Sequence, residues 1–440
     1  MNILYVLPGS GGSFYCQNCL RDAAAAAALQ LRGHTVTGLP LYLPAAASLP
    51  QANDAPVFYG AVSLYLRHRF AFLRRLPRAW FAPLDSWPVL RFAARFAGAT
   101  SAKGLEDLTL SMLRGPDGRQ ADELRTVCDW LSALPGDARP DAIILSNALL
   151  SGLAASLKQA AACPVVCWLQ DEHVWINAME PGLRDAALRV MAADARSVDR
   201  FVAASADYAS RMSRALSIDP ARIDVAYPGI DPTAYRPADV MRHPPVIGFL
   251  SRLAASEGFD RFVDAFLLLR QDPRFSRVRL SATGGPSEDR RFLRRQLKKL
   301  QAAGALGDAS VAPARFAVDR AGFLEELTLL SVPGGAQPEA FGYYAVEAMA
   351  AGVPVVLPRQ GAFPEIVAAA DCGTLTPDSR PETLARAWAD LLSDPARLRR
   401  ESDRGRSASQ TTFSQAASAA ALERALCLRR NPRPIETKTA

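Results

Sequence analysis

The sequence predicts two successive α/β domains, each built on a doubly wound parallel sheet. Short apolar runs alternate with helical stretches from residue 2 onward, and the same alternation restarts at residue 246. Between the two series, residues 228–245 contain five prolines, a density typical of a linker. Two such domains joined by a hinge would enclose a ligand cleft at the carboxyl ends of their strands.

The N-terminal series opens with a parallel βαβ unit. An apolar strand over 2–7 runs into a glycine loop, an alanine-rich helix covers 20–31, and a second strand follows near 35–42. The later runs are apolar throughout, which is typical of strands covered by helices on both faces. They predict strands over 141–145, 164–169, 200–204 and 223–227, with a helix over 147–162.

The C-terminal series repeats this pattern. A final helix, at about 413–429, is long enough to pack back on the N-terminal domain. We therefore expect an N-terminal domain over 1–235, a C-terminal domain over 236–410, and a helix with a polar tail over 411–440. The predicted strands of this series cover 246–251, 278–282, 327–332 and 353–357, and its helices cover 258–271, 287–303, 342–351 and 381–393.

Composition excludes several classes of protein. A chain of 440 residues with 49% hydrophobic and 22% charged residues is too long for one core and too apolar for disorder. Its net charge of +7 fits an anionic small ligand or a membrane surface better than nucleic acid. No apolar run reaches the ~18–20 residues of a membrane span, and the start lacks a secretory leader, so we expect a cytoplasmic protein. Seven scattered cysteines and four histidines predict neither a disulfide framework nor a metal site.

The densest candidate site lies at residues 332–356. A predicted strand runs into a loop with Glu339 and then into a helix with Glu347, so both carboxylates can face one cleft. Carboxylates accept hydrogen bonds from sugar hydroxyls, and N–H groups at a helix start suit phosphate oxygens. Taken alone, two glutamates at this spacing are better explained as a helix cap and a solvated residue.

This stretch resembles the Glu-x7-Glu signature of retaining glycosyltransferase family 4. The usual form, E-x-F-G-x-x-x-x-E-A-M-A-x-G-x-P-V-V, is matched at every fixed position from Glu339 to Val356. Three further segments are similar to family motifs, so the resemblance covers most of the chain. They are Gly361–Val367, Gly33–Val36 and Tyr227–Ile230.

The resemblance implies a GT-B fold and a nucleoside-diphosphate sugar as donor substrate, held mainly by the C-terminal domain without a metal or cofactor. Glu347 would bind the ribose hydroxyls, Glu339 the transferred sugar, and Arg252 the diphosphate. The glycine loop of Gly11 and Gly12 would let the backbone approach the diphosphate or the acceptor, or it is a turn without a ligand. The backbone groups implied at the donor's phosphates and sugar are those of Phe341, Gly342, Tyr343 and Tyr344.

One departure from the family pattern bears directly on the diphosphate. Glu257 stands where the family places a lysine that would add a second positive charge near the diphosphate. At ~4 Å and an effective dielectric near 20, a carboxylate there would repel the diphosphate by roughly 4 kcal/mol before screening. Either Glu257 turns away and another cation substitutes, with Arg261 and Arg359 as candidates, or donor binding is weak or absent.

The N-terminal domain offers a second candidate group after strand 164–169. Asp171 and Glu172 follow that strand, where a doubly wound domain presents its chemistry, and either could orient or deprotonate an acceptor hydroxyl. His173 comes three places later than the histidine that many family members carry. The alternative is an acidic loop that hydrogen-bonds a neighbouring helix start.

Residues 57–97 interrupt the α/β rhythm with many aromatic residues and seven arginines against one acid. We expect either a basic insertion that docks on anionic lipid or on a lipid-linked or acidic acceptor, or a helical cap with solvated arginines. The basic run Arg290–Lys299 is expected to be a solvated helix face.

The sequence therefore predicts a retaining hexosyltransferase that moves a sugar from a nucleoside diphosphate to a glycan, lipid-linked or small-molecule acceptor. Contact with the inner face of a membrane is a further hypothesis. The rival is a non-catalytic nucleotide-sugar sensor or a degenerate partner subunit, which Glu257 and the displaced histidine favour.

Overall fold

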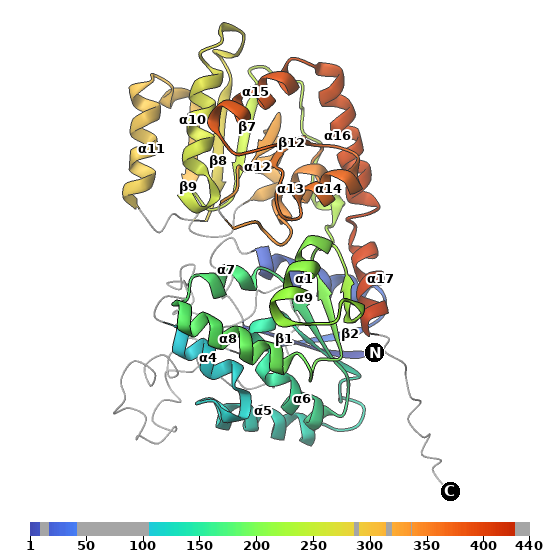
Figure 1. Cartoon of the computed structure of the whole chain (residues 1–440). Coiled ribbons are helices and arrows are strands. Elements are labelled where there is room, and N and C mark those ends of the chain that lie inside the picture. The colour runs from blue at the N-terminus through green and yellow to red at the C-terminus, as the bar shows by residue number, and fades with distance from the viewer. Residues whose placement is uncertain (9–16, 42–104, 286–289, 314–318, 336, 427–440) are drawn as a thin grey trace, which may run out of the picture.

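The computed structural model of the chain contains two parallel six-stranded sheets, one in each of two domains that meet end to end (Figure 1). It describes residues 1–8, 17–41, 105–285, 290–313, 319–335 and 337–426. The predicted pair of doubly wound α/β domains is therefore confirmed. The glycines Gly11 and Gly12 and the basic insertion at 57–97 lie outside the described residues.

The N-terminal sheet has the strand order β2-β1-β3-β4-β5-β6, and every pair is parallel. The order reverses between β1 and β3, which is where a doubly wound sheet opens a crevice for ligands. Its strands are β1 (Asn2–Leu7), β2 (Thr35–Pro40), β3 (Ala142–Leu145), β4 (Val165–Leu169), β5 (Arg200–Ala203) and β6 (Ile223–Val225). Its α-helices are α1 (Gln17–Leu31), α4 (Glu106–Leu113), α5 (Ala121–Ala133), α6 (Ala154–Ala161), α7 (Glu172–Asn177), α8 (Pro181–Asp194) and α9 (Ala206–Leu216).

The C-terminal sheet has the order β12-β11-β10-β7-β8-β9, again parallel throughout. Here the order reverses between β7 and β10, so the loops after these two strands form the expected ligand crevice. The strands are β7 (Val246–Leu250), β8 (Arg279–Gly284), β9 (Ala309–Pro313), β10 (Leu329–Ser331), β11 (Val355–Pro358) and β12 (Thr374–Thr376). The α-helices are α10 (Phe259–Leu269), α11 (Arg290–Ala302), α12 (Arg320–Glu325), α13 (Tyr343–Ala350), α14 (Phe363–Ala370), α15 (Pro381–Leu392) and α16 (Pro395–Gln410).

The last helix, α17 (Gln415–Leu426), crosses back to the N-terminal domain as predicted (Figure 1). Leu422 and Leu426 join the same apolar cluster as Tyr5 of β1, and burial of such side chains stabilises the return by roughly 1.5–3 kcal/mol each. Glu423 adds ion pairs at 2.7 Å to Arg32 and 2.8 Å to His34.

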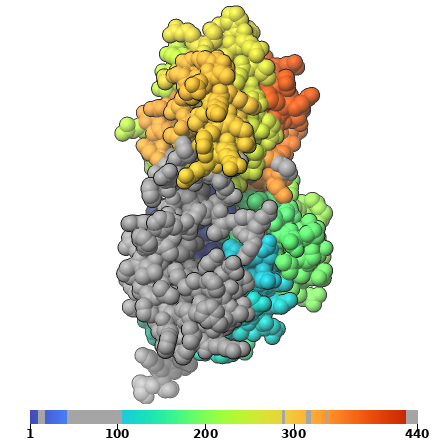
Figure 2. Space-filling view, turned by 90° about the vertical axis from the view of Figure 1, so that its left-hand side faces the viewer, coloured from blue at the N-terminus to red at the C-terminus, as the bar shows by residue number. Residues whose placement is uncertain are grey.

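The surface of the C-terminal domain shows the predicted solvated helix. All six cations of α11 are exposed, whereas Phe292, Gln296 and Leu300 face inward. This helix lies on the face of the domain that Figure 2 turns toward the viewer. Within the described ranges, no helix is long and apolar enough to cross a bilayer. The exposed cations of α11 are Arg290, Arg291, Arg294, Arg295, Lys298 and Lys299.

Candidate functional site

The loop after β10 and the start of α13 form the centre of the candidate site. Gly342 precedes α13 with φ at +77°, and a Cβ atom there would lie 2.4 Å from a ring carbon of Phe363. Only glycine combines this left-handed backbone with that close approach. The sequence motif therefore fixes the direction in which the loop enters the helix. We call residues 337–341 the Glu339 loop.

Glu339 is held by one hydrogen bond from each domain. Tyr344 Oη donates to its Oε1 at 2.6 Å, and Gln17 Nε2 of α1 donates to its Oε2 at 3.0 Å. Burial, reinforced by the negative charge of Glu257, raises the pKa of Glu339 to about 8. Gln17 Oε1 also accepts from Tyr343 N–H at 2.6 Å, so one amide side chain bridges Glu339 and the first N–H of α13.

Glu347 lies in the second turn of α13 with no exposed surface. Its Oε1 accepts from Arg320 Nε at 2.5 Å and from Tyr235 Oη at 2.8 Å. Arg320 opens α12, and Tyr235 belongs to the linker between the sheets. A buried carboxylate requires such a charge-assisted bond, since an unpaired charge in the interior is strongly unfavourable.

The aromatic side chains at the start of α13 contact the linker and the end of the chain that follows α16. Phe341 stacks on Tyr227 at 6.0 Å between ring centroids and meets Phe413 at 6.1 Å. Tyr343 Oη donates to the carbonyl of Gly229 at 3.0 Å. The side chains of Phe341 and Tyr343 therefore join the helix start to the linker, and Tyr343 N–H is bonded to Gln17. Donor binding by the backbone of residues 341–344 stays a prediction.

Arg252 and Glu257 meet at the end of β7. The guanidinium Nη2 of Arg252 lies 2.5 Å from Glu257 Oε1, and Ser256 Oγ lies 3.4 Å from the same oxygen. The possibility that Glu257 turns away is therefore wrong. The two proposed substitutes are occupied elsewhere or exposed: Arg261 donates to the carbonyl of Gly334, and Arg359 lies on the surface.

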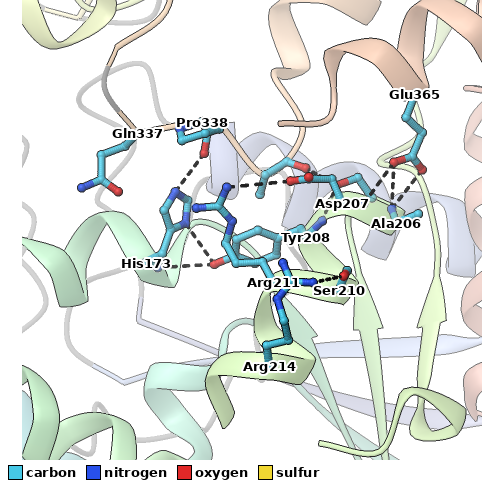
Figure 3. Close-up of polar contacts among 12 residues, drawn as sticks. His173, Ala206, Asp207, Tyr208, Ser210, Arg211, Arg214, Gln337, Pro338 and Glu365 are labelled. Atoms are coloured by element: carbon cyan, nitrogen blue, oxygen red, sulfur yellow. Dashed lines mark hydrogen bonds and ion pairs between the residues drawn. The ribbon is translucent and has the colours of Figure 1, made fainter. Parts of the chain in front are cut away.

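The N-terminal domain grips the Glu339 loop through its backbone. Asp171 Oδ1 accepts from Ala340 N–H at 2.8 Å, and Ser205 Oγ donates to the Ala340 carbonyl at 2.6 Å. Burial lowers the pKa of His173, and its ring Nε2 lies 2.9 Å from the Pro338 carbonyl (Figure 3). Asp171 also has a left-handed φ of 51°, a strained conformation for a non-glycine residue.

A second contact between the domains lies beside the first. The carboxylate of Glu365, in the first turn of α14, accepts from Ala206 N–H at 2.9 Å (Figure 3). Ala206 opens α9, so the carboxylate binds the positive end of that helix. Asn177 Nδ2 also donates to Gln337 Oε1 at 2.8 Å. Hydrogen bonds from α7, α9 and α14 therefore join the two domains along this edge.

The catalytic role predicted for Glu172 is not supported by its position. The residue is 2% exposed, and its carboxylate accepts from Ala148 N–H, Gln170 N–H and Tyr208 Oη at 2.7–2.8 Å. Burial raises its pKa to about 7. Three internal donors occupy both oxygens, so Glu172 orders the loop after β4 and does not approach an acceptor. The bond from Ala148 N–H, at the start of a 3₁₀ helix, agrees instead with the alternative stated for this loop, that its acidic residues bind a neighbouring helix start.

The structure thus brings Glu339, Tyr343 and Tyr344 together with Asp171 across the domain boundary. Sequence reasoning did not find Gln17, Tyr235 or Arg320, because each lies far along the chain from its glutamate and belongs to no recognised motif. No group of three or more His, Cys, Asp or Glu residues in the described part of the chain could hold a metal ion.

The C-terminal domain contains the part of the chain that matches a known family. Residues 244–394 match the family described as glycosyl transferases group 1. The D-inositol 3-phosphate glycosyltransferase of Rhodococcus opacus is 32% identical over 237 residues, 50% of either chain. The protein of the same name from Mycobacteroides abscessus is 29% identical over 48% of either chain. The chain thus spans about half the length of the curated relatives it matches.

Comparison with solved structures covers nearly the whole chain. HepE of Anabaena, solved in complex with UDP and glucose, aligns with a TM-score of 0.64 at 17% identity, over 97% of this chain and 99% of that one. Sucrose-phosphate synthase of Thermosynechococcus elongatus aligns with a TM-score of 0.66 at 17% identity, over 96% and 98%. At this identity the likeness concerns the fold alone.

Proposed function

We propose that the chain is a retaining hexosyltransferase of family 4, which is supported by the match of residues 244–394 to glycosyl transferases group 1 and by the GT-B fold. It moves a hexose from a nucleoside-diphosphate sugar to an acceptor hydroxyl. The observation that carries the proposal is the placement of two glutamates at one helix start, with Glu339 half-buried in the loop before α13 and Glu347 buried in its second turn. This helix start follows β10, where the strand order of the C-terminal sheet reverses.

Each part of the donor is bound by a different group of the site. Glu347 binds the ribose hydroxyls, and Arg320 and Tyr235 hold its carboxylate in place. Glu339 binds the transferred sugar, with Tyr344 as its support. Arg252 binds the diphosphate, and the N–H of Tyr343 joins it there by leaving Gln17 Oε1, so that both stabilise the charge that develops as the glycosidic bond breaks.

The acceptor approaches from the N-terminal domain. Asp171 acts as a positioning residue, because its carboxylate holds the Glu339 loop and with it the sugar-binding carboxylate. The acceptor oxygen bonds to the anomeric carbon on the face that the diphosphate leaves, and the leaving phosphate oxygen takes the acceptor proton. Glu172 has no part in this step.

The similar proteins suggest which donor and which acceptor to test first. HepE was crystallised with UDP and glucose, which supports a uridine diphosphate hexose as donor. The curated relatives are named for D-inositol 3-phosphate, which makes a small phosphorylated polyol one acceptor to test besides glycans and lipid-linked sugars.

No metal or other cofactor is required in this mechanism, because cationic and N–H groups take the charge of the leaving diphosphate. We also place the protein in the cytoplasm. Contact with the inner face of a membrane stays a prediction, to be tested by liposome flotation with charge reversal of the arginines in 57–97.

The direct test mixes the purified chain with UDP-glucose and other nucleotide sugars and measures release of the nucleoside diphosphate with each acceptor class. Release that depends on acceptor, persists in EDTA and yields a product of unchanged anomeric configuration is the expected result. Saturable donor binding without release, across all acceptors, would instead favour a non-catalytic sensor. That second candidate is motivated by the ion pair between Arg252 and Glu257.

A further inference from the structure

Glu257 is paired with Arg252, the cation that the proposed function assigns to the donor's diphosphate. Its Oε1 lies 2.5 Å from Arg252 Nη2, and its side chain is only 12% exposed. Carboxylate and phosphate oxygens bind a guanidinium in the same geometry. A diphosphate at Arg252 would therefore compete with an internal anion that is already in place.

The backbone keeps Glu257 at this position. It ends a 3₁₀ turn, Ala255–Glu257, and Gly258 follows with φ at +77°. A Cβ atom on Gly258 would lie 2.7 Å from the carbonyl of Gly334, and one on Gly335 would lie 1.8 Å from the carbonyl of Ser256. The loops after β7 and β10 thus pack backbone against backbone. With the backbone of Glu257 fixed in this way, the ion pair separates by rotation of the Glu257 or Arg252 side chain.

The charge of Glu257 reaches the sugar end of the site as well. Its carboxylate is the second cause, after burial, of the raised pKa of Glu339. A nucleoside-diphosphate sugar bound between Arg252 and Glu339 would therefore lie near two carboxylates, Glu257 after β7 and Glu339 after β10. The pair of Arg252 and Glu257 carries no net charge, where a lysine in place of Glu257 would give the same two positions +2.

Such a field acts more strongly on the product than on the donor. When the glycosidic bond breaks, its electron pair stays on the distal phosphate oxygen, and that phosphate becomes the terminal group of a diphosphate, held by its anhydride bond alone. Like a phosphorylated side chain, such a singly substituted phosphate has a second ionisation with a pKa near 6, so it carries about −1.5 to −2 at neutral pH, whereas each phosphate of the donor carries about −1. The product therefore presents more negative charge next to Glu257 than the donor does.

We propose that Glu257 is a specificity-determining residue that weakens binding of the nucleoside diphosphate product more than binding of the donor, and so speeds product release. The inference rests on the proposed function. It gives a role to the residue that departs from the family pattern: Glu257 displaces the spent nucleotide by returning to Arg252.

The test measures dissociation constants of UDP and UDP-glucose for the full chain by titration calorimetry, for wild type, Glu257→Gln and Glu257→Ala. The neutral variants should bind UDP about tenfold more tightly and UDP-glucose only about threefold, because repulsion scales with ligand charge. The control, Asp264→Asn, removes the same charge from α10, where Asp264 pairs with Lys299 of α11, and should change neither constant.

The two gains in affinity decide whether Glu257 acts on the product. A larger gain for UDP than for UDP-glucose in either folded variant supports the inference. Equal gains, or none, in proteins that bind both ligands overturn it and leave the proposed transferase intact, since Glu257 then only braces Arg252. If wild type and both variants bind neither ligand nor any other nucleotide sugar and its diphosphate, the proposed function fails, and this inference fails with it.

Discussion

At the scale of single residues, the surroundings of Glu339 favour its protonated form, and the hydrogen bonds from Tyr344 and Gln17 oppose that tendency. Burial raises the pKa of Glu339 to about 8, while the bond from Tyr344 Oη stabilises the ionised form. Glu339 can therefore change protonation state near neutral pH, where it would meet the hydroxyls of a sugar.

Removing that bond should shift the titration of Glu339 upward. In Tyr344→Phe we expect its apparent pKa to rise by roughly 0.5–1 unit, because a hydrogen bond contributes about 0.5–1.5 kcal/mol. The measurement is the pH dependence of donor turnover. Tyr343→Phe is the matched control, because its hydroxyl bonds to Gly229 instead and its loss should leave this pKa in place. A profile that does not move in Tyr344→Phe would contradict the assignment.

Glu172 should make stability depend on pH. Its folded pKa of about 7 exceeds the ordinary value of 4.5 because of burial. Between these values the unfolded chain has lost a proton that the folded chain keeps, so the free energy of unfolding falls as pH rises, by on the order of 3 kcal/mol in total. Urea denaturation from pH 4.5 to 7.5 should show a smaller fall in Glu172→Gln. Equal slopes would refute the buried titration.

At the scale of elements, the start of α13 depends on a glycine for two separate reasons. Gly342 has a left-handed φ and lies against the ring of Phe363. Gly304, after α11, shares the left-handed φ of +65° but has nothing within 4 Å of a Cβ position. The pair therefore separates backbone strain from steric overlap.

Replacing these glycines should destabilise the protein by different amounts. Gly304→Ala should cost about 1–2 kcal/mol, from the left-handed backbone alone. Gly342→Ala should cost more, by a further 1–3 kcal/mol or so, because the added methyl group overpacks the core at Phe363. Urea denaturation measures both. Equal costs would mean that the close contact at Gly342 relaxes freely.

The elements also show what the sequence could and could not predict. The buried strands β1, β4 and β7 were predicted almost to the residue, because continuous apolar runs between loops admit few alternatives. The short strands β9 and β12 were missed, since three to five residues at a sheet edge carry little pattern. Hydrophobic periodicity gave the core, whereas sheet edges depend on tertiary pairing.

The site was predicted unevenly for a related reason. Glu339 and Glu347 lie in one contiguous motif, so their neighbourhood could be inferred. Their partners Gln17 and Arg320 reach them only through the fold, from 322 and 27 residues away. Glu172 looked catalytic because it follows a strand end, but the sequence does not reveal that its side chain turns into the interior.

At the scale of the whole molecule, the domains are joined at the Glu339 loop by bonds from Asp171, Ser205 and His173. In Asp171→Ala we expect a more open molecule, because a charge-assisted bond worth about 1.5–3 kcal/mol is lost from the interface. Small-angle scattering should show a larger radius of gyration. Asp219→Ala, which removes a carboxylate bonded within the N-terminal domain, should not expand the molecule. An unchanged radius in Asp171→Ala would show that the remaining contacts suffice.

The most direct test of the account compares Glu347→Ala and Glu339→Ala in their affinity for UDP-glucose and in turnover. The account predicts that Glu347→Ala weakens donor binding at least about tenfold, because a hydrogen bond to a charged group is worth about 1.5–3 kcal/mol. It predicts that Glu339→Ala mainly lowers turnover, with the donor dissociation constant changed far less. Donor affinity that is unaltered in Glu347→Ala, in a folded protein, would contradict the claim that these two glutamates hold one donor between the domains.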